Sequence, residues 1–365
     1  MTTTTTAAER EDLRAAIRAF LADHLDEATV RELAETGDGF ARQMWAQFAG
    51  DLGVAGVLVP EEFGGQGLST VELGIVLQES GRALLGAPFL GSAVLATAAL
   101  LRAGDEPAAK KLLPALAEGS AVAALAVDDD PGTAVVATAT GGAWRLSGRK
   151  RHVVDLPAAD TVLVVAAADG GTGLFAVRAD GQGVHVEPSP SLDLTRKVGQ
   201  LRLQDAVAER IGGDFTAGLA AVSELGAFAC AAEQAGAAAR CLEIEVDYAK
   251  TREQFGRVIG FFQAIKHRLA EHLALVEQMR AAVEAAAVEL AENSSAAETV
   301  SVVKAYCGEA GSSVAEGLID TLGGIGFTWE HVAHLYLRRV KTLAYLFGSP
   351  AEHRERLADQ LGMLG

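Results

Sequence analysis

Apolar side chains recur at three- and four-residue spacing through much of the first 120 residues. The segment 9–25 shows this spacing first, and the segments 40–52, 71–84 and 92–103 repeat it. Such spacing places the apolar side chains on one face of an α-helix. We therefore predict a helical N-terminal region.

From about residue 121 the apolar residues occur instead in short runs rich in β-branched side chains. Gly, Asp and Pro separate these runs, which are 133–140, 144–148, 152–154, 161–167, 173–177 and 184–188. Runs of this kind favour strands, and the intervals are too short for the helices that join parallel strands. We predict a compact antiparallel β unit that ends near Asp214, and a Rossmann sheet is disfavoured.

The remainder of the chain is again typical of helices. No proline occurs between Pro190 and Pro350. Because proline breaks helix interiors, its absence over this distance permits long helices that pack as a bundle. The predicted fold class is therefore α+β and mostly α, in the order helices, β unit, helices.

Charge and composition limit the classes of partner. The net charge is -17 and the isoelectric point is near 4.9, which argues against nucleic acid and anionic membranes as partners. No charge-free run reaches the length of a membrane span, and the segment 1–9 lacks the features of a signal peptide. We expect a disordered lead-in there, and a cytoplasmic protein whose three scattered cysteines form no disulfide framework.

A short turn with Arg252, Gln254 and Phe255 lies between two predicted helices, which Gly256 and Gly260 break apart. A guanidinium matches phosphate oxygens and an aromatic face stacks on rings, so this turn suits a phosphorylated, ring-bearing cofactor. The alternative is a helical hairpin with a solvated Arg and a core Phe. The spacing alone does not decide between them.

The run from Tyr248 to Ala270 resembles the signature of the acyl-CoA dehydrogenase family, flavoenzymes that introduce a double bond next to a thioester carbonyl. A second, distant match is the Pro-Glu-Glu-Phe-Gly-Gly loop at 60–65. The resemblance implies an N-terminal helical domain (1–120), a middle β-barrel-like domain (121–214) and a C-terminal four-helix bundle (215–365). It also implies FAD as cofactor, an acyl-CoA thioester as substrate, and no metal.

The resemblance assigns cofactor contacts to residues that reach into a neighbouring subunit. Arg252 and Phe255, with Gln254 and Gln263 nearby, would contact the FAD of a partner chain. The segment 320–331 is similar to the family's Gly-Gly-x-Gly segment, in which Gly323 and Gly324 let the backbone approach the cofactor. Asp320 stands where many members have Gln, and its charge would repel phosphate.

A site shared in this way makes the protein an obligate homo- or hetero-oligomer, a dimer or a tetramer. An electron-transferring flavoprotein is a further candidate partner. Arg338, Arg339 and Lys341 are candidates for the phosphates of the thioester, against the alternative of a solvated helix face. His331 and His334 lack a third metal ligand at helical spacing.

The residue that removes the substrate proton departs from the family pattern. In most members this base is a Glu at the position where Phe347 stands here. A minority place it on the helix before the Arg-x-x-Phe-Gly turn, where an ungapped count reaches Gly226 and Ala227. Glu224 and Glu233 lie near that position and are candidates, against the alternative of a surface or buried hydrogen-bonded Glu.

The β unit departs as well. The loop at 126–132 is shorter than the family's flavin-holding loop and lacks its hydroxyls, and His152, Val153 and Val154 replace Trp-Ile-Thr. It is therefore open whether this chain's own β domain holds flavin.

Three functions remain. The first is flavin-dependent α,β-dehydrogenation of an acyl-CoA, carried out alone or within a heteromer. The second is a catalytically silent partner that completes the FAD site of a homologous active chain. The third is a flavin-free protein that binds acyl thioesters or acts as a scaffold. Retained cross-subunit elements favour the second over the third.

Overall fold

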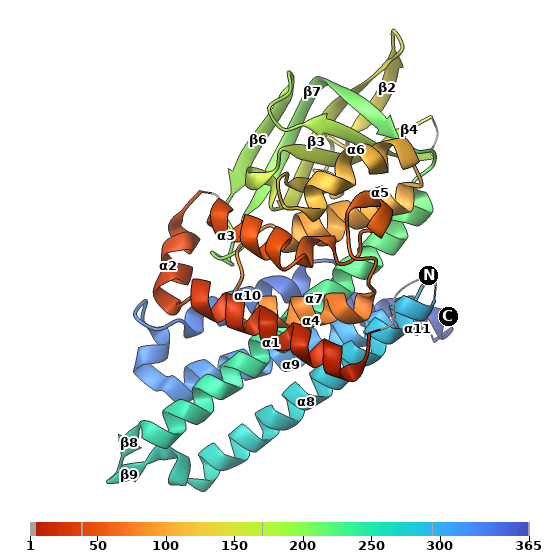
Figure 1. The fold of residues 1–365 in the computed structure, drawn as a ribbon. Coiled ribbons are helices and arrows are strands. Elements are labelled where there is room, and N and C mark those ends of the chain that lie inside the picture. Colours follow the sequence, from red (N-terminus) through yellow and green to blue (C-terminus); the bar gives the residue numbers. More distant parts are fainter. Residues whose placement is uncertain (1–4, 38, 170, 294, 364–365) are drawn as a thin grey trace.

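A computed structural model of the 365-residue chain describes residues 5–37, 39–169, 171–293 and 295–363. Helices from the two ends of the sequence pack together, and a β region lies at one end of them (Figure 1). The predicted class, α+β with mostly helices, is confirmed. Within the described residues, no helix is both long enough and apolar enough to cross a membrane.

The N-terminal region is helical as predicted. Its α-helices are α1 (Ala7–His24), α2 (Glu27–Glu35), α3 (Arg42–Ala46), α4 (Thr70–Arg82), α5 (Thr97–Ala103) and α6 (Glu106–Ala117). A capping box between Thr6 and Glu9 starts α1. The expected disordered lead-in is therefore wrong for 7–9, which are helical, and its first four residues lie outside the described part of the chain.

Two stretches predicted as single helices change their winding. The π-helix η1 (Gln47–Asp51) follows α3, and the π-helix η4 (Phe89–Ala96) precedes α5. Every residue of η4 is buried. This apolar segment passes through the core between the β region and α7 (Thr216–Thr251).

The β region forms a sheet that curls round on itself. Its strands are β1 (Ala123–Ala126), β2 (Val136–Thr140), β3 (Ala143–Val154), β4 (Thr161–Ala168), β5 (Gly171–Arg178), β6 (Val184–Ser189) and β7 (Val198–Ile211). Neighbours pair in the order β4, β2, β3, β7, β5, and β5 pairs back with β4. This closure makes the region barrel-like.

The prediction of an antiparallel unit is wrong in part, because β1 pairs with β4 in parallel, as does β2 through the pair Val136–Ala167. The sequence reading also missed β7. Its alternation of buried and exposed side chains is interrupted at Asp205, whose φ of 53° reverses the local backbone. That interruption hides the two-residue period of a strand.

The C-terminal region consists of long helices. They are α7, α8 (Gln263–Glu292), α9 (Ala297–Leu322), α10 (Ala333–Tyr345) and α11 (Pro350–Gln360). The bundle is formed by α7 to α10, and α11 packs on α9. A small hairpin, β8 (Glu253–Gln254) and β9 (Arg257–Val258), joins α7 to α8 and projects from the end of the bundle (Figure 1).

Candidate active site

The turn between α10 and α11 carries Phe347, whose φ of 60° is rare for a residue with a side chain. The buried amine of Lys304 donates hydrogen bonds to the carbonyls of Leu343, Ala344 and Gly348, at 2.8 to 3.0 Å. His353 Nε2 lies 3.0 Å from the carbonyl oxygen of Phe347. Burial lowers the pKa of Lys304. These contacts hold the turn in place.

The phenyl ring of Phe347 packs against α7 at Gly226. A β-carbon at position 226 would lie 2.7 Å from ring atoms Cε1 and Cζ of Phe347. The two positions at which the family resemblance would place the base therefore face each other. One supplies a phenyl ring and the other a hydrogen atom, so neither offers a carboxylate.

Glu224 lies one turn of α7 or less from Gly226 but is used elsewhere. Its carboxylate accepts hydrogen bonds from the Ser295 hydroxyl at 2.9 Å and from the backbone N–H of Ala296. These contacts tie α7 to the start of α9. They favour the hydrogen-bonded alternative, and a catalytic role for Glu224 stays a prediction.

Glu233 lies at the place where the three regions of the chain meet. Its Oε2 atom is 2.6 Å from Arg196 Nη2 and 3.3 Å from Arg339 Nη1, and its side chain is buried. Two buried guanidiniums thus pair with this carboxylate inside the protein. This too favours the buried alternative, and the role of Glu233 as a base stays a prediction.

Arg339 is wholly engaged inside the protein. It donates to Asp193 at 2.5 Å, to the Thr195 hydroxyl at 2.6 Å and to the carbonyl of Leu85 at 3.1 Å, and its side chain is fully buried. The proposal that it serves the phosphates of a thioester is therefore wrong, as is the alternative of a solvated face. The nearby Asp155 is also buried, which raises its pKa to about 6.

The two other cations proposed for the thioester are only partly exposed. Arg338 lies over the Trp329 ring, 5.4 Å from its centroid, and donates to the carbonyl of Leu192. Lys341 pairs with Glu316 at 2.6 Å. Their proposed role stays untested.

The predicted cofactor-binding turn lies at the tip of the β8–β9 hairpin. It contains Arg252, Gln254 and Phe255 and is called the corner below. Phe255 and Gly256 form its two-residue turn with φ values of 53° and 74°, and the Phe255 side chain is 89% exposed. Arg252 and Gln254 are exposed beside it, and Gln263 is exposed at the start of α8. The alternative of a core Phe is wrong.

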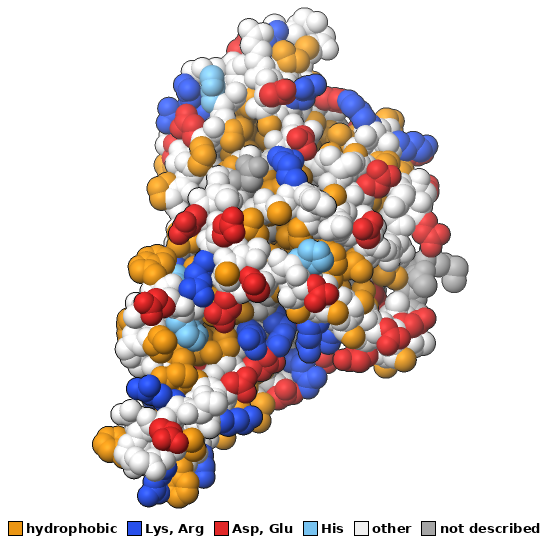
Figure 2. All heavy atoms as spheres, turned by 60° about the vertical axis from the view of Figure 1, so that its left-hand side comes forward, with side chains coloured by type: hydrophobic (Ala, Val, Ile, Leu, Met, Phe, Trp, Pro, Cys, Tyr) orange, Lys and Arg blue, Asp and Glu red, His pale blue; other side chains and the backbone are white. Residues whose placement is uncertain are grey.

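The projecting lobe in Figure 2 carries hydrophobic and positively charged side chains. Phe261 is 57% exposed there and lies under the Arg257 guanidinium, 4.3 Å from ring centroid to Cζ. Exposed aromatic side chains on a projecting hairpin make this lobe a candidate contact surface.

The segment Gly323–Gly324, called the bend below, follows α9 directly. Gly323 has φ 63° and ψ -135°, a conformation open essentially to glycine alone. A β-carbon at Gly323 or Gly324 would meet nothing within 4 Å, whereas one at Gly326 would come within 3.0 Å of the Ile319 carbonyl. Internal packing therefore explains Gly326 and leaves the backbone of Gly323 and Gly324 open to an external group.

The corner and the bend belong to the same end of the bundle. The Tyr248 hydroxyl, near the end of α7, donates to the Leu322 carbonyl at 3.4 Å. Arg268 Nη1 lies 3.8 Å from Asp320 Oδ2 and offsets its charge. The sequence analysis predicted neither the Tyr248 hydrogen bond nor the Arg268 ion pair. Both residues belong to the segment 248–270 that resembles the family signature.

The same end exposes more aromatic surface. Phe327 is 78% exposed and Trp329 is 65% exposed, and Arg31 of α2 donates to the carbonyl of Trp329. Aromatic residues beside a Gly-rich segment could have predicted this exposed surface. The sequence analysis did not predict it.

Two charged residues of the loop 126–132 pair with side chains of β3. The buried amine of Lys150 contacts two residues of the loop 126–132. It donates a hydrogen bond to the Val127 carbonyl at 2.9 Å and forms an ion pair with Asp129 at 2.6 Å. Asp128 accepts from Arg151 and lies 2.8 Å from His152 Nδ1. Carboxylates held in this way offer a flavin ring no hydrogen-bond donors. Asp128 and Asp129 therefore offer a flavin ring no side-chain donor.

Metal ligands are not clustered in the part of the chain that the structure describes, where no three His, Cys, Asp or Glu side chains are placed to hold an ion. His331 Nδ1 accepts from the Ala333 N–H at 3.0 Å. The His334 ring meets Trp329 edge-on, with centroids 4.5 Å apart.

Two family models match most of the chain. Residues 7–120 match the model of the acyl-CoA dehydrogenase N-terminal domain, and residues 221–362 match that of the C-terminal domain. The chain is 35% identical to acyl-CoA dehydrogenase IpdE2 of Mycobacterium tuberculosis, with 97% of each chain covered. It is 33% identical to acyl-CoA dehydrogenase FadE27 of the same organism, with 91% of each covered.

A solved structure shares the whole fold. It is a chain of the ChsE4-ChsE5 complex from Mycobacterium tuberculosis. The TM-score is 0.91, the sequence identity is 31%, and the match covers 100% of this chain and 100% of the matched chain.

Proposed function

Because the chain belongs to the acyl-CoA dehydrogenase family, we propose that it takes part in the α,β-dehydrogenation of an acyl-CoA thioester as one subunit of a heteromeric flavoenzyme. FAD, when bound, supplies the hydride acceptor for this chemistry. The observation that carries the proposal is the pairing of an exposed Phe255 corner with an open Gly323–Gly324 bend at one end of the bundle.

Each residue of this end has a role that its exposure supports. Arg252 offers a guanidinium to a cofactor phosphate, and Phe255 offers a flat face to a ring. Gly323 and Gly324 offer bare backbone. Gln254 and Gln263 add amides beside the corner. Their exposure supports contact with a cofactor that a neighbouring subunit holds.

Removal of the proton next to the thioester carbonyl needs a positioned base. The facing pair of Phe347 and Gly226 provides none in this chain. Glu224 and Glu233 are the candidates for the base within this chain, and in a heteromer the partner chain is a further source of it. The name of the ChsE4-ChsE5 complex describes an assembly of two different chains, which supports a heteromer here.

The alternative function is not favoured by the relatives, which are acyl-CoA dehydrogenases. In it the chain is catalytically silent and only completes the FAD site of a homologous active chain. The two candidates differ in whether this chain's own pocket receives substrate. We also propose a cytoplasmic location, supported by three buried free cysteines, and an electron-transferring flavoprotein as the electron acceptor.

Expression alone and with the homologous chain encoded beside it tests the proposal. We expect the chain alone to be colourless, and the co-purified complex to carry flavin whose visible absorbance bleaches when an acyl-CoA is added. A yellow homo-oligomer that bleaches with acyl-CoA would show that the chain has its own base. Flavin-free protein in both preparations would refute the assignment to flavin chemistry.

A further inference from the structure

A buried pair of titratable side chains lies near the end of the bundle that carries the corner and the bend. Glu245 of α7 and His272 of α8 place Oε2 and Nδ1 2.8 Å apart, and their side chains are 0% and 7% exposed. The second carboxylate oxygen, Oε1, is buried without a hydrogen-bond partner among the described residues. Burial of an ionised carboxylate is costly unless a charge and hydrogen bonds compensate it. The proposed dehydrogenation gives this pair no role.

The imidazole is enclosed by α9 as well. A β-carbon at Gly317 would lie 2.1 Å from His272 Cε1 and 2.7 Å from its Nε2. A residue without a side chain leaves room for the ring there, although glycine inside a helix costs about 1 kcal/mol relative to alanine. Three helices, α7, α8 and α9, therefore meet at His272.

The same three helices are joined again one turn closer to the corner and the bend. The Tyr248 hydroxyl, one turn after Glu245 in α7, donates to the Leu322 carbonyl of α9 at 3.4 Å. Arg268, one turn before the imidazole in α8, lies 3.8 Å from Asp320 of α9. Helical residues three or four positions apart lie on one face of the helix. The buried pair thus lies on the faces through which the corner and the bend are connected.

The charged groups that act on Glu245 come from α8 and α9. Burial raises the pKa of its carboxyl group, His272 and Arg268 oppose that shift, and Asp320 adds to it. Arg268 and Asp320 pair with each other and are 39% and 65% exposed, so solvent screens both charges. Burial raises the pKa of the Cys241 thiol, one turn before Glu245, well above its ordinary value, so this thiol stays neutral. His272 is therefore the buried partner whose proton offsets the carboxylate.

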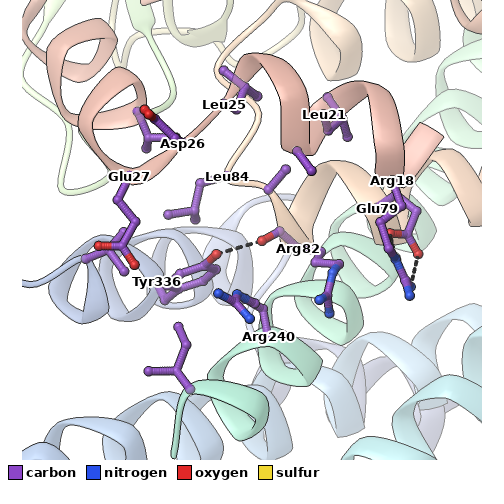
Figure 3. Close-up of a pocket in the computed structure, with 15 residues that line it drawn as sticks. Arg18, Leu21, Leu25, Asp26, Glu27, Glu79, Arg82, Leu84, Arg240 and Tyr336 are labelled. Atoms are coloured by element: carbon purple, nitrogen blue, oxygen red, sulfur yellow. Dashed lines mark hydrogen bonds and ion pairs between the residues drawn. The ribbon is translucent and has the colours of Figure 1, made fainter. Parts of the chain in front are cut away.

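On the side of α7 that faces α10, the charges stay constant from weakly acidic to weakly alkaline pH. Arg82 and Arg240 share the carboxylate of Glu243 there, and Figure 3 shows both arginines next to Tyr336. Against the effect of burial, the two guanidiniums lower the pKa of Glu243. Burial raises the pKa of the Tyr336 hydroxyl, which donates to the Arg82 carbonyl. Because a guanidinium also stays protonated, a pH response at Glu245 does not come from this side.

We propose that Glu245 and His272 share one proton and that this proton couples the corner to the bend. While the pair holds it, the buried carboxylate faces a positive imidazolium, and α7, α8 and α9 stay packed at this level. As the pH rises, the proton passes to solvent and the carboxylate is left buried beside a neutral ring, which weakens the packing. The segments that carry the corner and the bend then open more often. The inference concerns the packing of this chain and holds whether or not flavin binds.

Because the pKa of Glu245 is raised in the folded chain, the folded state binds the proton more tightly than the unfolded state. The stabilisation is therefore fully present below about pH 4 and is lost as the pH rises through the folded-state pKa.

Hydrogen–deuterium exchange on the purified chain or its co-purified complex tests the coupling. Rates are measured at about pH 5 and about pH 9 and are corrected for the intrinsic pH dependence of exchange. We expect amide protection in the segments 248–252 and 319–323 to fall together at least about tenfold, the factor that one unit of pKa represents. No acyl-CoA is added, so the outcome does not depend on the proposed activity.

Matched variants separate proton sharing from packing. Glu245→Gln keeps an oxygen for the imidazole and removes the charge, so protection at the alkaline pH should exceed that of the natural protein and the pH response should vanish. His272→Gln removes the ring that binds the proton, and the response should vanish there too. Glu271→Gln and His185→Gln, both at exposed positions, are the controls and should keep the full response. A response that persists in Glu245→Gln, or its absence from the natural protein, would overturn the proposal.

Histidine-selective NMR of the natural protein provides a second measurement that needs no folded variant. A proton held between an imidazole Nδ1 and a carboxylate gives an N–H resonance far downfield. We expect this resonance from His272 at weakly acidic pH, and we expect it to disappear as the pH rises. Its absence throughout the range would also overturn the proposal.

Discussion

The ring of Phe347 fills the space that Gly226 leaves by having no side chain, with 2.7 Å between the ring and the site of a β-carbon on α7. By the family resemblance, Phe347 stands where most members are expected to carry the catalytic base. Gly226 stands where a minority of members are expected to carry it. The contact links the two departures physically. A glycine at 226 is what lets a phenyl ring, rather than a carboxylate, occupy the turn.

Gly226→Ala should therefore destabilise the protein, although alanine favours helices over glycine by about 1 kcal/mol. The added methyl group must displace the Phe347 ring, and overpacking of this kind costs about 1 to 3 kcal/mol. Denaturant unfolding should show a lower free energy of unfolding. In a Phe347→Ala background the same change should become neutral or stabilising. A stabilising effect of Gly226→Ala in the natural protein would contradict the close contact.

The buried ion pairs around Arg339 should be among the most sensitive positions of the chain. Arg339→Met removes the partner of the buried Asp193 and one of the two partners of Glu233. Removal of one member of a buried pair typically costs about 3 to 5 kcal/mol. The neighbouring Arg338→Met is the matched control and should cost less than about 1 kcal/mol. Equal losses in the two variants, measured by thermal and denaturant unfolding, would refute this distinction.

The sequence pattern was sufficient for elements whose signals are local. Apolar spacing predicted α1 and α4, and the lack of proline predicted the long helices after residue 215. It failed at β7, where the reversal at Asp205 breaks the alternation. It also failed for the parallel pairing of β1 with β4, because strand partners are chosen by distant residues.

The site was predictable to the extent that it is carried by contiguous motifs. The exposed Phe255 and the open Gly324 follow from two short segments. Arg339 was misread because its partners Asp193 and Glu233 lie 146 and 106 residues away in the chain. No local pattern distinguishes an arginine that meets two such carboxylates from one that faces solvent.

Asp155 should make the stability of the protein depend on pH between about 4 and 6. Burial raises its pKa from an ordinary value near 4 to about 6, against the opposing effect of Arg196 and of the Gly91 N–H. The folded state therefore binds the proton more tightly, so the stabilisation is fully present below pH 4 and is lost as the pH rises through 6. The loss amounts to roughly 3 kcal/mol.

Asp155→Asn isolates this effect. Asp155 has a φ of 57°, and asparagine tolerates that backbone conformation while keeping an oxygen for the Gly91 N–H. The free energy of unfolding of the variant, minus that of the natural protein, should rise between about pH 4 and pH 6. A difference that stays flat across this window would show that Asp155 keeps an ordinary pKa.

Phe255→Ala and Arg252→Gln should leave the chain's own stability unchanged and still deprive the heteromeric complex of flavin. Both side chains are exposed at the tip of the hairpin, so their removal leaves no cavity or unpaired buried charge. Loss of the aromatic face or of the phosphate partner should weaken cofactor retention about tenfold or more. Flavin absorbance per complex after gel filtration, set beside the thermal midpoint of the isolated chain, measures the two effects separately.

Val207→Ala is the control for this prediction. It removes an apolar side chain of β7 that is 56% exposed, and it should change neither flavin absorbance nor thermal midpoint. Full flavin retention in both hairpin variants would mean that the cofactor does not lie against this corner.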